Sequence, residues 1–262
     1  MNLKLENKPV IVMASSSGIG LGVALEFARE KANVMLFGRS KDRLETAQKL
    51  ILEQTGTVVK YTIGDITNKE DIELLVQNTL DSYGYIYALF NNTGGPIAAK
   101  FNELTDEDWI NAFELTLLSY IRSIRSVIPI MKKAGGGKIV NNTSISIKQA
   151  IDNLILSNTF RTGIVGLSKT LSRELAKDNI LVNVVGAGKT ATQRVDYLDS
   201  VRAKELGVPI EAIQEQSAKS IPLKRYGKTE EMAKLVVFLC SEANTYITGQ
   251  SILVDGGMVG GY

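Results

Sequence analysis

The sequence predicts a single α/β domain of the Rossmann-like type, with a doubly wound parallel sheet of about seven strands and helices on both faces. Short apolar runs with strand character alternate with amphipathic helical stretches along the whole chain. A small-residue turn with two glycines joins the first such strand to the first helix. The 262 residues, 44% of them hydrophobic, suit one large core over 1–262, and no linker or repeat divides them.

The composition excludes several classes of function. Thirty basic and 28 acidic residues nearly balance, and no basic run offers a nucleic-acid surface. The chain has no histidine and one cysteine, Cys240, so we expect neither a metal site nor a disulfide framework. Residues 1–8 are polar, and no uncharged apolar run approaches the roughly 20 residues that span a bilayer. We therefore expect a cytoplasmic protein that binds neither nucleic acid nor membrane.

The first strand is expected at Val10–Ala14, a continuous apolar run. Ser15-Ser16-Ser17-Gly18-Ile19-Gly20 follows at once, and a helical pattern begins at Leu21. Such a turn lets the backbone approach a ligand, while the helix start offers free N–H groups and a positive dipole end. The unit predicts a phosphate site for a dinucleotide; the alternative is a tight turn that binds nothing.

The second strand is expected at Val34–Phe37. An NAD site favours a carboxylate just after this strand to hold the ribose hydroxyls, and none is present. Arg39 with Ser40 suits a 2′-phosphate instead, through charge-assisted hydrogen bonds, so we expect NADP rather than NAD. The alternative is that Arg39, Lys41 and Arg43 are only the solvated start of a helix.

A helix and a third strand are expected over 41–54 and 57–63. Asp65 follows this strand and is placed either to accept from an adenine amino group or to cap. Thr67 and Glu70 have the spacing of a capping box, which predicts that Thr67 begins the next helix.

The fourth strand is expected at Ile86–Phe90 and ends in Asn91-Asn92-Thr93-Gly94-Gly95-Pro96. The small residues would let a cofactor lie over the strand ends, and Asn91 is also placed to tie neighbouring strands together. Thr105 and Asp108 have a capping-like spacing before a long helix over 109–132. The apolar stripe of that helix is typical of a core or of a subunit contact: Phe113, Leu117, Ile121, Ile124 and Ile128.

The fifth strand, Lys138–Thr143, leads into the stretch with the most chemistry. Ser144 stands at its carboxyl end, where open parallel sheets usually place their sites. A helix begins near Leu154, and Ser157 and Arg161 share one of its faces, about 6 Å apart along the axis. The alternative is that both are ordinary helix-surface residues.

The helix continues to Ala176, and a sixth strand is expected at Leu181–Val185. Thr192, shortly after it, is placed to bond a cofactor carboxamide or pyrophosphate; the alternative is a plain turn. The polar, helical stretch 193–227, broken by Pro209 and Pro222, predicts a mobile substrate lid. Thr229 is expected to cap a helix that ends at Cys240, before a seventh strand at 251–254.

The chain resembles the short-chain dehydrogenases/reductases over essentially its whole length, and is similar to their 3-oxoacyl-carrier-protein-reductase-like members. The matching pieces are Ala14-Ser15-Ser16-Ser17-Gly18-Ile19-Gly20, Gly64-Asp65-Ile66, Asn91-Asn92-Thr93-Gly94, Ser144, Gly188 with Thr192, and Ile247-Thr248-Gly249 continuing to Gly257. The resemblance implies hydride transfer between NAD(P) and a small carbonyl or alcohol substrate, in a homotetramer or homodimer. With Arg39 and Ser40, it implies cofactor contacts from Ala14, Ser16, Ser17, Gly18, Ile19, Gly20, Asp65, Ile66, Asn92, Thr93, Gly94, Arg161, Gly188 and Thr192.

The chain also departs from the family pattern. Met13-Ala14 replaces the usual threonine and glycine, and Ala187-Gly188 replaces proline-glycine. The family's catalytic asparagine, serine, tyrosine and lysine map onto Thr116, Ser144, Ser157 and Arg161.

These departures leave three readings open. The first is an active oxidoreductase in which Ser144 and Ser157 position the substrate oxygen and Arg161 stabilises negative charge. Its proton would come through water or from a lid residue such as Tyr197. The second is a cofactor-binding pseudoenzyme that acts as a sensor or oligomer partner. The third is a fold that serves only in assembly.

Overall fold

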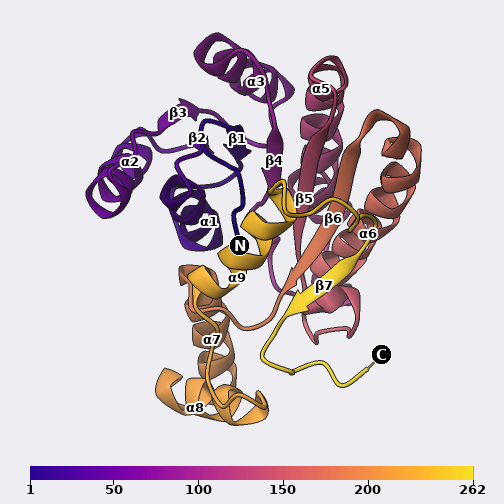
Figure 1. The fold of residues 1–262 in the computed structure, drawn as a ribbon. Helices are drawn as coiled ribbons and strands as arrows, with labels where there is room; N and C mark the ends of the chain where they lie inside the picture. Colours follow the sequence, from indigo (N-terminus) through magenta and orange to yellow (C-terminus); the bar gives the residue numbers. More distant parts are fainter. Residues whose placement is uncertain (262) are drawn as a thin grey trace.

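A computed structural model describes residues 1–261 as a seven-stranded sheet in the order β3-β2-β1-β4-β5-β6-β7 (Figure 1). Every neighbouring pair of strands is parallel. The strand order reverses between β1 and β4, which is the switch point where open α/β sheets bind ligands. This confirms the predicted fold class. The strands are β1 Pro9–Val12, β2 Asn33–Gly38, β3 Lys60–Ile63, β4 Ala88–Asn91, β5 Gly137–Ser144, β6 Ile180–Ala187 and β7 Ser251–Val254.

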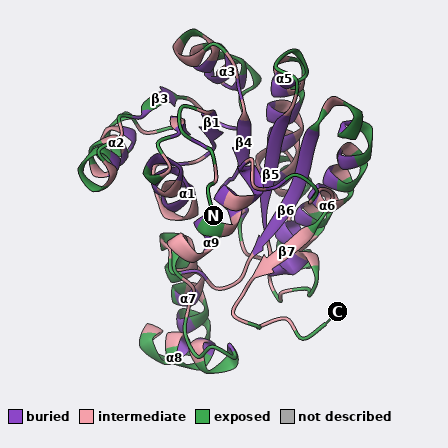
Figure 2. Ribbon diagram, in the orientation of Figure 1, coloured by how far each residue is buried: buried purple, intermediate pink, exposed green. Residues whose placement is uncertain are grey.

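Helices cover both faces of the sheet. They are α1 Gly18–Arg29, α2 Lys41–Thr55, α3 Lys69–Tyr83, α4 Asp106–Phe113, α5 Ser119–Lys133, α6 Ile155–Glu174, α7 Gln193–Leu206, α8 Ile210–Ser220 and α9 Thr229–Cys240. Successive residues of β1 face opposite sides, so Val10 and Val12 pack with α1, α2 and α9, while Ile11 packs with α3 and α5. Because both faces are covered, the central strands are buried throughout (Figure 2), as their continuous apolar runs require.

The long helix predicted over 109–132 is interrupted. A single π-helical turn, Glu114–Leu118, separates α4 from α5, and π turns of this kind are frequent at functional sites. In the apolar stripe, Ile124 is buried, whereas Phe113, Leu117, Ile121 and Ile128 are only half-buried.

Two of the three predicted helix caps are wrong by one residue. Asn68, not Thr67, caps α3, and its side chain accepts from the Asp71 N–H at 3.0 Å. The Thr67 hydroxyl donates to Asp65 at 2.7 Å and lies one residue before the N-cap position.

Thr229 is the first residue of α9, and the N-cap position belongs to Lys228, whose N–H donates to Glu231 at 2.7 Å. The Thr229 side chain instead packs against Gly22 of α1, where an added Cβ would lie 2.7 Å from it. The Thr105–Asp108 box is confirmed, with the Thr105 hydroxyl donating to Asp108 at 2.7 Å.

The stretch predicted as polar and helical over 193–227 forms α7 and α8 (orange in Figure 1), which project from the end of the sheet where β6 ends. Pro209 breaks the pattern at the N-cap position of α8. None of the helices described for residues 1–261 combines the length and the apolar character that a bilayer crossing requires.

Candidate functional site

A ladder of asparagine side chains joins the carboxyl ends of β1, β4 and β5. The Asn91 amide donates to Asn141 at 2.8 Å, and the Asn142 amide donates to Asn92 at 2.7 Å. The Asn92 amide lies 3.4 Å from the carbonyl oxygens of Met13 and Ala14, beyond β1. Asn91 therefore ties strands together, which was one of its two predicted roles. The ladder holds this edge of the sheet in a fixed shape.

The glycine-containing turn forms an open backbone cradle at this edge. Gly18 has φ +57°, and a Cβ on Gly20 would lie 2.2 Å from the Ala14 carbonyl oxygen, so both positions require glycine. Ser17 stands at the N-cap of α1, but no side chain caps the first N–H groups of that helix. Free N–H groups at a helix start bind phosphate, so the cradle fits the pyrophosphate of a dinucleotide. Ser16 faces Gly38 at the end of β2 and Ile19 is half-buried.

Ala14 adopts a left-handed backbone conformation, with φ +46°. That conformation costs a residue with a Cβ about 1–2 kcal/mol. We expect Ala14→Gly to raise the free energy of unfolding by about 1 kcal/mol, or the melting temperature by roughly 2 °C. Calorimetry checks this against Ala134→Gly, at an ordinary φ of −81°, which is expected to destabilise. Equal effects of the two substitutions would contradict strain at Ala14.

Thr192 and Gly188, in the segment after β6, lie close to this edge. The Thr192 methyl group would be 3.6 Å from a Cβ on Gly18, so Thr192 is positioned next to the cradle. Its hydroxyl also caps α7, accepting from the Val195 N–H at 3.4 Å. Gly188 has a packing role, because a Cβ added there would lie 2.5 Å from the Asp255 Cα, too close for any side chain. A Cβ on Gly94, after β4, would meet only open space.

The ends of β2 and β3 bring Arg39 beside Asp65. Their side chains approach to 3.8 Å, and Arg39 remains 81% exposed, so this loose ion pair leaves the guanidinium available. Ser40 caps α2 by accepting from the Arg43 N–H at 3.4 Å. Burial opposes ionisation of Asp65, but hydrogen bonds from Thr67 and the charge of Arg39 hold its pKa below the usual value. Ile66 differs from these residues, because its side chain is buried in the core.

Ser157 and Arg161 meet on the buried face of α6. The Arg161 Nε donates to the Ser157 hydroxyl at 3.1 Å, and Nη1 donates to the Asn142 carbonyl at 3.4 Å. Both residues are 7% exposed. The alternative reading of ordinary helix-surface residues is therefore wrong. Ser144 ends β5, and its hydroxyl accepts from the Ser146 N–H at 3.3 Å.

The Arg161 guanidinium has no carboxylate among the partners that residues 1–261 provide. Burial lowers its pKa, and the neighbouring Tyr120 phenol opposes that change. An arginine remains protonated in such a place, because its usual pKa lies above 12. The side chain therefore carries a buried positive charge held only by neutral oxygens, which can stabilise an anion nearby.

Unpartnered polar atoms are concentrated in the segments that end at this edge of the sheet. Within the described part of the chain, six buried side-chain atoms lack a hydrogen-bond partner, although one of them, Asp178 Oδ2, forms an ion pair with Lys132 Nζ at 2.7 Å. That atom and the Tyr87 hydroxyl lie elsewhere. The other four are Thr93 Oγ1 after β4, Asn142 Oδ1 within β5, Ser146 Oγ after β5 and Thr116 Oγ1 in the π turn. Buried polar groups are normally paired, so this concentration is expected of a site that receives a polar ligand.

Two site residues escaped the sequence analysis. Tyr120 lies four residues beyond Thr116 on the same helical face, and its hydroxyl donates to the Asn142 carbonyl at 2.8 Å, which also accepts from Arg161. The helical spacing from Thr116 was a signal that could have found it. Arg194, in the first turn of α7, donates to the Pro96 carbonyl at 2.6 Å, and no sequence pattern indicated that contact.

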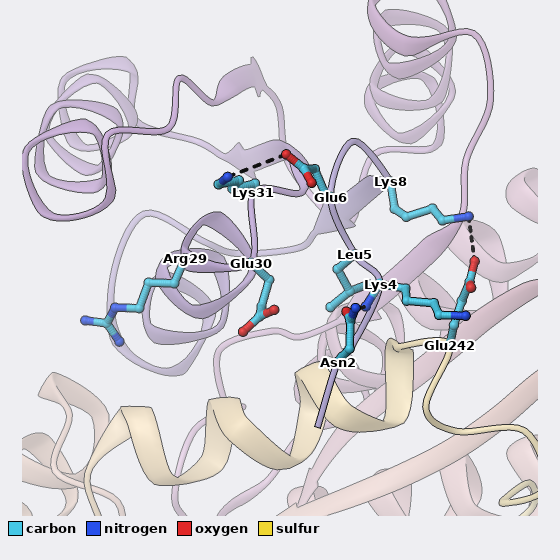
Figure 3. Close-up of a pocket in the computed structure, with 9 residues that line it drawn as sticks. All are labelled: Asn2, Lys4, Leu5, Glu6, Lys8, Arg29, Glu30, Lys31 and Glu242. Atoms are coloured by element: carbon cyan, nitrogen blue, oxygen red, sulfur yellow. Dashed lines mark hydrogen bonds and ion pairs between the residues drawn. The ribbon is translucent and has the colours of Figure 1, made fainter.

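A hollow of about 460 Å³ lies elsewhere, before β1 (Figure 3). Its lining residues carry charges of both signs, including Lys8 paired with Glu242 at 2.7 Å and Lys31 with Glu6 at 3.6 Å. Because Lys8 immediately precedes β1, this hollow lies at the amino end of the sheet, opposite the candidate site. Two of its cations are paired with carboxylates, unlike Arg161.

Comparison with known proteins gives concordant results. Residues 13–259 match the family described as Enoyl-(Acyl carrier protein) reductase. The chain is 34% identical to 3-oxoacyl-[acyl-carrier-protein] reductase FabG of Chlamydia trachomatis serovar D, over 97% of this chain and 98% of that protein. It is 34% identical to dehydrogenase/reductase SDR family member 4 of Oryctolagus cuniculus, over 97% and 94% of the two chains.

Among solved structures, L-sorbose reductase from Gluconobacter frateurii, complexed with NADPH and L-sorbose, superposes with a TM-score of 0.94. The two sequences are 33% identical, and the match covers 100% of each chain. The fold, the order of the motifs and the relatives agree over nearly the whole length. The chain therefore belongs to the short-chain dehydrogenase/reductase family.

Proposed function

We propose that this protein is an NAD(P)-dependent oxidoreductase that acts on a carbonyl or alcohol substrate through an atypical active site. The observation that carries the proposal is the meeting, at one edge of the sheet, of a phosphate-binding cradle with a buried, unpaired arginine and unpartnered polar atoms. When bound, a nicotinamide supplies or accepts the hydride. The solved relative that holds NADPH supports this choice of cofactor.

The cradle of Ser16–Gly20 is suited to the pyrophosphate, with Thr192 beside it and the open space at Gly94. Arg39 and Ser40 would bind a 2′-phosphate, and Asp65, Ile66, Asn92 and Thr93 would line the path between the two ends. We therefore propose NADP rather than NAD.

At the reacting end, the hydroxyl groups of Ser144 and Ser157 position the substrate oxygen. Arg161 stabilises the negative charge that develops there, and its pKa keeps it from moving a proton at neutral pH. The proton comes through water or from Tyr197 of α7. We propose that residues 193–227 form the lid that closes over this chemistry.

The proposed contact between Arg39 and a 2′-phosphate can be tested directly by comparing NADPH with NADH. We expect Arg39→Ala to weaken NADPH binding about tenfold and to leave NADH binding unchanged, because a charge-assisted hydrogen bond is lost only with NADPH. Fluorescence titration with both nucleotides measures this. Lys49→Ala, an exposed cation farther along α2, is the control. An equal effect of Arg39→Ala on both nucleotides would remove the argument for NADP, and absence of binding by either would refute the proposed function.

One observation favours a second function, that of a cofactor-binding pseudoenzyme. The position of the family's tyrosine is held by Ser157, whose hydroxyl is far less acidic than a phenol. Such a protein would bind NADPH as a sensor or oligomer partner without turnover. Assays with a panel of carbonyl compounds separate the two functions once binding is established.

A homodimer or homotetramer is proposed as the working assembly. The stripe on α4 and α5 supports it, because Phe113, Leu117, Ile121 and Ile128 keep part of their apolar surface exposed. Sedimentation analysis at micromolar concentration measures the assembly directly.

A further inference from the structure

Arg194 joins the segment after β6 to the loop after β4. It belongs to α7, after β6, and its Nη2 donates at 2.6 Å to the carbonyl of Pro96, in the loop after β4. Its guanidinium also lies against Gly95, where an added Cβ would be 2.8–3.0 Å from it. Because β5 lies between β4 and β6 in the sheet, this contact joins segments that follow the two strands flanking β5, which ends at Ser144.

A second arginine, Arg161 of α6, contacts β5 near its carboxyl end. Arg161 is bonded to the carbonyl of Asn142, two residues before Ser144 on β5. Burial lowers the pKa of Arg194, and the positive charge of Arg161 lowers it further. The ion pairs described for residues 1–261 include neither arginine, so the two guanidinium groups, close enough for one charge to act on the other, lack a carboxylate counterion.

The free donors of Arg194 match a carboxylate. A guanidinium has five N–H donors, and the Pro96 carbonyl occupies one of them. The Tyr197 ring, 5.5 Å from the Arg194 Cζ, packs beside the group and limits its movement. The planar fork of an arginine pairs with carboxylate oxygens in a bidentate manner, which makes it selective for that group.

We propose that the substrate is an oxo acid or a hydroxy acid, whose carboxylate binds Arg194 while its reacting oxygen lies at Ser144, Ser157 and Arg161. The reaction itself rests on the proposed function, whereas the binding of a carboxylate at Arg194 does not. Arg194 is thus a specificity-determining residue. A neutral carbonyl compound would leave both positive charges uncompensated and would bind less well.

The test compares acetoacetate with methyl acetoacetate, which differ in the charge of the carboxyl group. We expect kcat/KM with NADPH to be about 10- to 100-fold higher for the acid, and Arg194→Gln to bring the ratio close to one. Arg202→Gln, an exposed arginine on the same helix, is the matched control and should leave the ratio unchanged. Calorimetric titration of both compounds into the protein, with and without NADP⁺, is expected to give the same preference in Kd.

Three outcomes would overturn the inference. The first is an equal kcat/KM for acid and ester, and the second is an equal loss of kcat/KM for both compounds in Arg194→Gln. The third is a loss of NADPH affinity in that variant while the acid-to-ester ratio of kcat/KM is retained. The last would assign Arg194 to the cofactor pyrophosphate. If neither compound is turned over, the proposed function fails for this substrate class. The calorimetric acid-to-ester ratio then still decides whether Arg194 binds the carboxylate.

Discussion

Replacing Arg161 with methionine is expected to lower kcat by about 10²- to 10³-fold, as removal of a positioned charge from a reacting oxygen does. The guanidinium contacts Ser157 and the Asn142 carbonyl and has no carboxylate partner, so its charge is available to the substrate. Steady-state assays with NADPH and a carbonyl substrate measure the loss. Arg173→Met, at an exposed position of the same helix, should retain the activity of the unaltered protein.

The same substitution is expected to leave the fold intact. A buried ion that lacks an opposite charge contributes little net stability, and an apolar side chain of similar length fills the same space. The melting temperature of Arg161→Met should therefore equal or exceed that of the unaltered protein. Unchanged turnover in a folded variant would remove Arg161 from the active site.

Restoring the tyrosine and lysine that the family uses for proton transfer is expected to raise kcat by a similarly large factor. The double substitution Ser157→Tyr with Arg161→Lys should raise kcat by about 10²-fold or more, because a positioned general acid contributes roughly 10²- to 10⁴-fold. A phenol, with an ordinary pKa near 10, becomes a better donor when an ammonium group lies beside it. The Ser157 hydroxyl cannot supply this.

The matched control is Ser157→Phe with Arg161→Lys, which has the same ring and the same charge but no hydroxyl group. Stopped-flow measurement of NADPH oxidation distinguishes the chemical step from product release. If the tyrosine and phenylalanine variants react at the same rate, the missing acid does not limit this enzyme.

The sheet was predictable because a short apolar run in the sequence marks each of its strands. Buried parallel strands such as β1 and β4 need continuous apolar runs. The half-buried edge strand Ser251–Val254 matches the predicted seventh strand residue for residue. The contact between Ser157 and Arg161 was also predictable, because helical spacing alone places them on one face. The glycine-containing turn was recognisable because its glycines follow a strand and precede a helix. The structure supplies the reason for one of them, since Gly20 has no room for a side chain.

Other features depend on contacts between distant segments. Thr67 has good capping spacing, but its side chain bonds to Asp65, and the helix begins one residue later with Asn68 as its cap. Arg194 lies 98 residues beyond Pro96 in the chain, and only the order of the strands brings the two together. No local pattern encodes such a contact.

The most direct test of the central claim is to follow the hydride itself. The protein is incubated with NADPH deuterated at the nicotinamide C4, on each face in separate experiments, and with a panel of oxo acids and neutral carbonyl compounds. Mass spectrometry of the alcohol product should show one added deuterium with one of the two labelled cofactors, and Arg161→Met should slow that transfer by about 10²- to 10³-fold. Binding of NADPH without label in any product would contradict the account and would instead identify a cofactor-binding protein without turnover.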